Sequence, residues 1–368
     1  MKSFLFPSKI IRILLLVHFH VSCTLALPKD SSCRVEEHGV PSTPMPTAIL
    51  SNGVKMPILS LGTAHYSFRL KHKDSNAPFA GFYPERTYRQ IEQALQRGIR
   101  SFDTALMYGS QPQLGFVLGQ WWASGKLQSR DDVFITTKVF HSPAPAFGLQ
   151  RNQLDDLNSL SPAQVAEQVE QHIEQCLHEL GVGYIDLLLM HWPSDEGQPV
   201  EISRQRRLAA WKVFETFYQR GWLRAIGVSN FSEKHLQDLM DDGATIRPMV
   251  NQIEASPYLQ FTKIVEYCQQ HNIQVQSYSP LGSGLNNVKD DPLLHELAAK
   301  HNKDVGQVAL RYLVQKGYAV AYLTTSAERM VTNPQIFDFE LDESDIKSID
   351  GLNRADGSFG LPSPYDLP

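Results

Sequence analysis

The sequence predicts an α/β fold: a single (β/α)8 TIM barrel with an N-terminal β-hairpin. From about Thr47, short apolar runs alternate with longer amphipathic stretches, which is typical of successive βα units. Eight such units over about 290 residues match the size of one eight-stranded barrel. Most short runs are continuously apolar, as expected of parallel strands that are buried on both faces.

The elements follow in chain order. Asn52-Gly53, between residues 48–50 and 54–56, predicts a tight hairpin before the first βα unit. Eight strands are then expected at residues 59–62, 100–103, 133–138, 185–190, 225–228, 249–252, 273–277 and 319–323. A doubly wound sheet is the rival architecture. It is disfavoured because no G-x-G-x-x-G follows the first strand, and Gly282-Ser283-Gly284 lacks the third glycine.

The helices between the strands carry recognisable ends. The clearest spans residues 162–180, with Ser161 as N-cap, Pro162 at the first helical position and Gly181 just past the end. A second amphipathic helix runs through Trp211 to Gly221.

Composition limits the partners. The chain has 368 residues, 42% of them hydrophobic, and a formal net charge of -5 without a basic block, so nucleic acid is not expected as a partner. Of four cysteines, Cys23 and Cys33 precede the barrel, so no disulfide framework is indicated. We expect a monomer that acts on a small molecule.

The N-terminus predicts a signal or targeting peptide over residues 1–26, because basic residues precede a short apolar run. A bipartite organellar leader or a short anchor is the alternative. Residues 27–46 are expected as a linker, 47–353 as the barrel and 354–368 as a C-terminal loop, with no membrane span in the mature body. The expected destination is the secretory pathway or an organelle, or the cytoplasm if the leader is not functional. The sequence has one glycosylation sequon, at Asn230.

Several polar residues lie at the carboxyl ends of the predicted strands, which is where barrels of this type have their active sites. Asp103 ends the second strand, Tyr108 follows five residues later, Lys138 ends the third strand and His191 follows the fourth. Each has an ordinary structural explanation: a helix N-cap, a solvated lysine or a core histidine. Their occurrence at consecutive strand ends favours one catalytic rim.

These four side chains predict proton donation to a carbonyl oxygen. A lysine beside a phenol lowers the pKa of the phenol, and a carboxylate keeps the lysine charged. Tyr108 would then act as a general acid, while a neutral His191 orients the oxygen. Side chains supply no hydride, so a nicotinamide cofactor is implied. The sequence has no nucleophile elbow, HExxH motif or paired cysteine ligands, and no metal is expected.

At these residues the chain resembles the aldo-keto reductases, over residues 49–353. The matching phrases are Leu61-Gly62-Thr63, 102–105 with Tyr108 and Gly115, Thr137-Lys138, Asp186 through 191–193, 227–231, Asn251-Gln252 with Glu254 and Pro257, 278–282 and 337–339. The resemblance implies NAD(P)H-dependent reduction of aldehydes or ketones, sugar carbonyls included, to alcohols. It also implies that Asp103, Tyr108, Lys138 and His191 form the catalytic set.

The resemblance further implies a cofactor site. Ser229, Asn230 and Gln252 would hold the nicotinamide carboxamide, and Tyr278 would stack on its ring. The remaining expected contacts are Gly62, Thr63, Ser279, Leu281, Ser283, Thr324, Arg329 and Asn333.

The chain departs from the family at the adenosine end of this cofactor site. The family usually carries a lysine six residues before the arginine, and this lysine grips the 2′-phosphate of NADPH. Leu323 stands there in this chain. We expect NADPH as the cofactor, and the loss of the lysine leaves NADH or use of both open.

Expected substrate contacts are Tyr66, Phe140, His191 and Trp192. Segments 67–83 and 141–159 are longer than the family pattern and are expected over the catalytic rim. Two other functions remain open for such a barrel: a cofactor-binding redox sensor or regulator with little turnover, and an isomerase or lyase.

Overall fold

The hairpin predicted around Asn52-Gly53 lies at the start of the part of the chain that the structure describes. This computed structural model describes residues 45–64, 84–141, 160–194, 198–284, 288–354, 361 and 363–368. All of them belong to one compact unit, Gly39–Pro368. The predicted leader, Tyr66 and almost all of the two long rim segments lie outside the described residues, so their predicted roles stay predictions.

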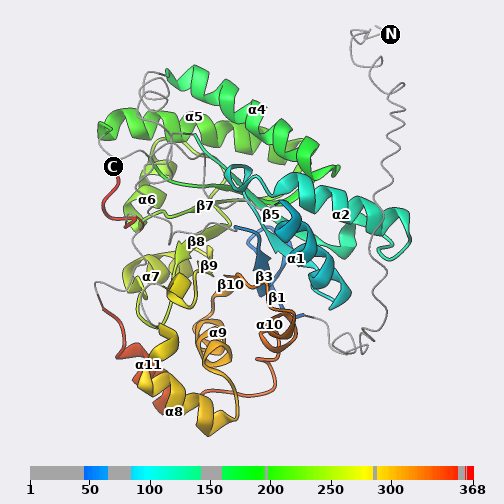
Figure 1. The fold of residues 1–368 in the computed structure, drawn as a ribbon. Helices are drawn as coiled ribbons and strands as arrows, with labels where there is room; N and C mark the ends of the chain where they lie inside the picture. The colour runs from blue at the N-terminus through cyan, green and yellow to red at the C-terminus, as the bar shows by residue number, and fades with distance from the viewer. Residues whose placement is uncertain are drawn as a thin grey trace, which may run out of the picture. The chain divides into compact units, whose positions relative to one another are not determined.

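Eight parallel strands close into a barrel in the order β10-β3-β4-β5-β6-β7-β8-β9 (Figure 1). Their bounds are β3 (Leu59–Gly62), β4 (Ser101–Asp103), β5 (Phe134–Val139), β6 (Ile185–Met190), β7 (Leu223–Ser229), β8 (Val250–Glu254), β9 (Gln274–Tyr278) and β10 (Ala319–Tyr322). The (β/α)8 prediction is confirmed and the doubly wound sheet is wrong. Strand β7 begins at Leu223, earlier than expected. The sequence pattern suggests a later start because the polar Arg224 interrupts the apolar run, but in the strand the Arg224 side chain pairs with Asp186.

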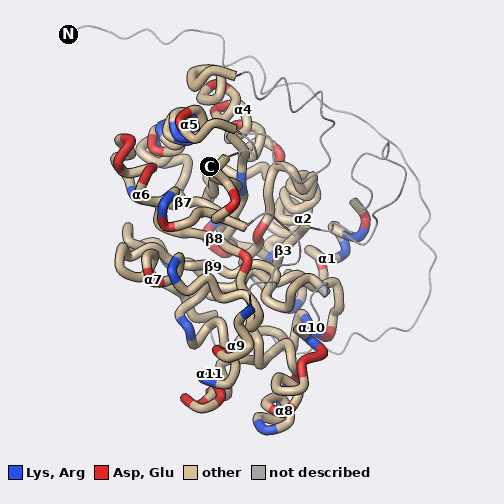
Figure 2. Tube along the Cα trace, turned by 90° about the vertical axis from the view of Figure 1, so that its left-hand side faces the viewer, with Lys and Arg blue, Asp and Glu red and all other residues tan. Residues whose placement is uncertain are grey.

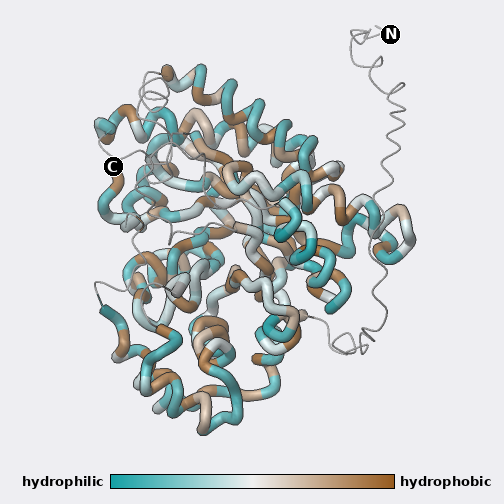
Figure 3. The backbone as a smooth tube through the Cα atoms, in the orientation of Figure 1, coloured by the Kyte–Doolittle hydropathy of each residue, from teal (hydrophilic) through white to brown (hydrophobic). Residues whose placement is uncertain are grey.

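Helices surround the barrel (Figure 1). Their bounds are α1 (Pro84–Gln96), α2 (Gln111–Ala123), α4 (Pro162–Leu180), α5 (Val200–Gln219), α6 (Glu233–Asp241), α7 (Thr262–Gln270), α8 (Pro292–His301), α9 (Val305–Gln315), α10 (Ala327–Thr332) and α11 (Glu343–Asp350). Hydrophobic and hydrophilic segments alternate along these helices (Figure 3), as expected where one face packs on the barrel. Lys and Arg are interspersed with Asp and Glu along the described chain (Figure 2).

The ends of α4 match the sequence signals. Ser161 and Gln164 form a capping box, Pro162 occupies the first helical turn, and Gly181 adopts a left-handed φ of 64°. A residue with a Cβ is strained at that φ, so glycine suits the position after the helix. No helix among the described residues has the length and apolarity needed to cross a membrane.

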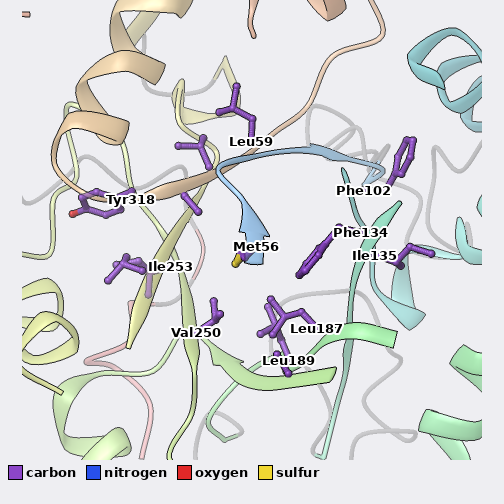
Figure 4. Close-up of a cluster of buried hydrophobic side chains, with 14 of the residues drawn as sticks. Met56, Leu59, Phe102, Phe134, Ile135, Leu187, Leu189, Val250, Ile253 and Tyr318 are labelled. Carbon is purple, nitrogen blue, oxygen red and sulfur yellow. The ribbon is translucent and has the colours of Figure 1, made fainter. Parts of the chain in front are cut away.

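The hairpin closes the amino-terminal end of the barrel. Strands β1 (Thr47–Ile49) and β2 (Lys55–Pro57) pair antiparallel, which confirms the predicted hairpin. Met56 is fully buried and lies close to Phe134 and Val250, the first residues of β5 and β8 (Figure 4). Because this end is filled with apolar side chains, chemistry is left to the opposite, carboxyl end.

Candidate active site

The four predicted catalytic side chains come together at the carboxyl end of the barrel. Asp103 is the last residue of β4, Lys138 lies in β5, His191 follows β6, and Tyr108 ends the short helix η1 (Leu106–Tyr108). The Lys138 Nζ donates to Asp103 Oδ1 at 2.6 Å and lies 5.0 Å from the centroid of the Tyr108 ring. The ring centroids of Tyr108 and His191 are 5.8 Å apart, edge to face.

The ion pair is buried and held by further hydrogen bonds. Lys138 is 1% exposed, and its ammonium also donates to the carbonyl oxygen of Thr104 at 3.0 Å. Gln252 Nε2 donates to the second carboxylate oxygen of Asp103 at 2.7 Å and to Gln276 Oε1 at 2.7 Å. These contacts exclude the simpler explanations, a solvated lysine and an aspartate that only caps a helix. Gln276 was not predicted as part of this site, although an amide inside the expected strand 273–277 is a signal in the sequence; in the structure Gln276 is fully buried.

The ion pair changes the expected pKa of Tyr108. Burial, with Asp103 as a second cause, raises the pKa of Tyr108 well above 10.0. The expectation of a lowered Tyr108 pKa is therefore wrong in this structure, because burial and Asp103 outweigh the effect of the Lys138 ammonium. The physical reason is that Asp103 compensates the ammonium charge and that the phenol is itself removed from water. Tyr108 is consequently a neutral phenol that carries a proton at neutral pH.

His191 is neutral as predicted. Burial lowers its pKa well below 6.5, and the nearby Lys138 charge lowers it further. Its ring stacks on Phe140, with centroids 4.6 Å apart. Phe140 also packs against a small apolar cluster of Trp192 and Leu367. The described substrate-site predictions, Phe140, His191 and Trp192, thus lie together around one wall of the mouth.

The residues predicted to hold a nicotinamide form a connected polar group beside His191. Asn230 Nδ2 donates to the His191 carbonyl oxygen at 3.0 Å, and Tyr278 donates its hydroxyl proton to Asn230 Oδ1 at 2.8 Å. Ser229 Oγ donates to the Gln252 carbonyl oxygen at 2.8 Å. Two side-chain amides and a hydroxyl offer the donors and acceptors that a carboxamide requires, and an aromatic ring lies next to them. The residues present fit a nicotinamide.

The loop after β9 has the backbone of a ligand-binding segment. Ser279 and Ser283 adopt left-handed φ values of 52° and 51°, and Gly282 has a φ of 63°. Non-glycine residues in this region are uncommon and cluster at functional sites. Their hydroxyls are linked, with Ser283 Oγ donating to Ser279 Oγ at 2.8 Å. Small side chains and left-handed backbone suit close approach of a pyrophosphate. Leu281 lies in the same loop, half-buried.

The other predicted cofactor residues lie at the end of β3 or in the segment that follows the neighbouring strand β10. Thr63 is fully buried and donates to the Asp103 carbonyl oxygen at 3.1 Å, so it positions β4, while Gly62 lies at the rim. After β10, Arg329 Nε donates to Thr324 Oγ1 at 3.4 Å. Asn333 is buried at the end of α10. Leu323 is 51% exposed. Within the described ranges, no three His, Cys, Asp or Glu side chains gather as metal ligands.

Comparisons with known proteins give matches over most of the chain. A family model described as the Aldo/keto reductase family matches residues 59–354. Glyoxal reductase of Bacillus subtilis (strain 168) is 33% identical over 328 residues, which cover 89% of this chain and 99% of that protein. NADPH-dependent codeinone reductase 1-4 of Papaver somniferum is 34% identical over 327 residues, covering 85% and 91%. The crystal structure of the silkworm aldo-keto reductase AKR2E5 complexed with NADPH aligns with a TM-score of 0.70, at 30% identity over 84% of this chain and 88% of that one.

Proposed function

Because the chain belongs to the aldo/keto reductase family, we propose that it reduces small aldehydes and ketones to alcohols with Tyr108 as the proton donor. The chain is an NAD(P)H-dependent carbonyl oxidoreductase that binds a nicotinamide cofactor. One observation supports the finer proposal above all others. A buried Lys138–Asp103 ion pair lies against the ring of Tyr108, next to a neutral His191.

The proposed proton transfer follows from the charges around Tyr108. Its raised pKa keeps the hydroxyl protonated, so the proton is available when a carbonyl oxygen gains negative charge. The Lys138 ammonium, buried and fixed by Asp103, stabilises the phenolate that donation leaves behind. A neutral imidazole at His191 orients the same oxygen by hydrogen bonding without competing as an acid. When bound, the reduced nicotinamide supplies a hydride to the carbonyl carbon.

The proposed carboxamide contacts are Ser229, Asn230 and Gln252, with Tyr278 against the nicotinamide ring. The side chains of Ser229, Asn230 and Tyr278 form one hydrogen-bonded group beside His191, and Ser229 also bonds the carbonyl oxygen of Gln252. All of these residues come from a single chain, and we propose that the monomer is the active form. Gel filtration that shows activity only in a fraction of dimer mass would contradict the proposal of an active monomer.

We propose compact aldehydes and ketones as substrates. The stacked pair of Phe140 and His191 and the apolar cluster with Trp192 favour small apolar groups on the carbonyl. The B. subtilis relative is named glyoxal reductase, and a small dicarbonyl fits this class. The predicted contact from Tyr66 remains part of the proposal, because it lies outside the described residues.

Replacing Tyr108 by Phe tests the proton donor. The Tyr108→Phe variant should lose turnover by about a hundredfold to ten-thousandfold, the usual range for a general acid, while it still binds the cofactor. Decay of NADPH absorbance with a panel of small aldehydes measures turnover, and quenching of intrinsic fluorescence measures cofactor binding.

Tyr88→Phe is a matched control, because Tyr88 lies on α1 and its hydroxyl donates to Gln120, its one hydrogen bond among the described residues. A Tyr108→Phe variant with normal turnover rules out the proposed proton donor. If the wild type binds NADPH, as measured by fluorescence quenching, but turns over none of the substrates, the redox-sensing alternative is favoured. Cofactor absorbance that stays constant while a substrate rearranges would favour the isomerase alternative.

A further inference from the structure

The start of α1 lies on the rim of the barrel, next to the loop that follows β10. Gln90 Nε2 donates to the carbonyl oxygens of Gly62 at 3.1 Å and of Thr324 at 2.8 Å. Gln90 is 2% exposed, so these bonds fix α1 to the carboxyl ends of β3 and β10. A pocket of about 750 Å³ opens here, lined by the first turns of α1 and by Thr325.

Two arginines from different elements reach the hydroxyls of this loop. Arg86 Nη2 donates to Thr325 Oγ1 at 3.4 Å, and Arg329 Nε donates to Thr324 Oγ1 at 3.4 Å. Both arginines are exposed, and neither pairs with a carboxylate in the part of the chain that the structure describes. Two cationic side chains thus point at neighbouring hydroxyls without a fixed counter-charge.

The charges at the pocket favour an anion. Arg86 and Arg89 both line it, and Glu85 is the one carboxylate among its described lining residues. A guanidinium binds phosphate oxygens with two parallel N–H donors, and threonine hydroxyls add neutral donors. The aliphatic side chain of Leu323 offers no donor at the start of this loop.

We propose that Arg86, together with Arg329 at the neighbouring Thr324, binds the 2′-phosphate on the adenosine ribose of the cofactor. An arginine from α1 then supplies the positive charge that Leu323 lacks, and the chain selects NADPH over NADH. This inference rests on the proposed function, since it assigns one end of the same cofactor. It assigns no role in hydride or proton transfer to Arg86.

Equilibrium binding to the purified protein tests the proposal without any turnover. Dissociation constants for NADP⁺, NAD⁺ and 2′-AMP are measured by calorimetry for the wild type and for Arg86→Ala. The variant should bind NADP⁺ and 2′-AMP about tenfold more weakly, because one charge-assisted contact is lost. Binding of NAD⁺, which carries no 2′-phosphate, should be unchanged.

Arg97→Ala is the matched control, because Arg97 follows the opposite end of α1 and, within the described ranges, its side chain bonds only to the backbone of Gln93. Leu323→Lys, added to Arg86→Ala, should restore NADP⁺ binding by returning a cation to the loop. The inference is overturned if Arg86→Ala leaves NADP⁺ binding unchanged or weakens NADP⁺ and NAD⁺ equally. A wild type that binds neither dinucleotide contradicts the proposed function itself, which separates the two failures.

Discussion

At the scale of single residues, the ion pair of Lys138 and Asp103 determines the chemistry available at the barrel mouth. Two buried charges are costly unless each is paired and hydrogen-bonded. Here Lys138 has two acceptors, and Asp103 receives one donor on each carboxylate oxygen. Burial still lowers the pKa of Lys138, against the opposing effect of Asp103. A pair held this firmly keeps a cation beside the ring of Tyr108.

The pKa directions predict an unusual pH dependence for carbonyl reduction. Tyr108 must be protonated to donate, and its pKa is raised, so kcat/KM should stay constant through neutral pH and fall only above about 10. The pKa of His191 is lowered, so no loss should occur as pH falls through 6.5. Initial rates at saturating cofactor across a pH series measure both limbs.

Asp103→Asn provides the contrast for this pH series. It removes the negative charge that helps to raise the pKa of Tyr108, so the alkaline limb should move to lower pH. Turnover should also fall by about tenfold or more, because Lys138 is positioned less firmly. A wild-type alkaline limb well below 10 would show instead that Lys138 dominates, as the sequence alone implied.

At this scale, the sequence predicts the positions of the catalytic side chains better than it predicts their pKa values. Asp103, Tyr108, Lys138 and His191 could be placed at one rim because strand ends follow from the apolar pattern. The pKa of Tyr108 depends on burial and on the exact pairing of charges, which the linear sequence does not contain. Arg86 was missed for a similar reason. An arginine on an exposed helical turn carries no signal until the neighbouring loop is known.

At the scale of elements, α2 and α4 approach closely at Gly115. An ideal Cβ built on Gly115 would lie 2.5 Å from the carbonyl oxygen of Leu180, at the end of α4. That distance is far below van der Waals contact, and the obstructing atom belongs to the backbone. The close approach anchors the start of α2 shortly after Tyr108. The helix that follows the proposed proton donor is thereby fixed against its neighbour.

Gly115→Ala should therefore destabilise the protein despite the better helix propensity of alanine. Forcing an extra methyl group into a packed contact typically costs about 1 to 3 kcal/mol, while Gly to Ala in a helix gains about 0.5 to 1 kcal/mol. Gly119→Ala is the control on the same helix, since nothing lies within 4 Å of its Cβ position. It should raise the free energy of unfolding. Urea denaturation measures both, and equal stabilisation by both substitutions would contradict the close approach.

At the scale of the whole molecule, the barrel and its hairpin could be predicted because buried parallel strands leave long apolar runs with turn residues between them. The order of strands follows from repeated βα connections, which place each strand next to the previous one. The adenosine end of the cofactor site was harder, because α1 and the loop after β10 are more than two hundred residues apart. Only closure of the barrel brings β10 beside β3.

The predicted leader and the glycosylation sequon at Asn230 bear on the destination of the whole chain. We propose that residues 1–26 target the protein to the secretory pathway or an organelle and that the active form carries no glycan on Asn230. Its Nδ2, the atom that a glycan would modify, donates to the His191 carbonyl oxygen and to Ser229 Oγ, and the residue is 2% exposed. A glycan there would displace the contacts beside the proposed nicotinamide site.

Cell fractionation of tagged protein, with and without residues 2–26, should show loss of organellar localisation on deletion. Mass spectrometry of the active fraction should find unmodified Asn230, and active protein that is fully glycosylated at Asn230 would contradict the proposed cofactor contact.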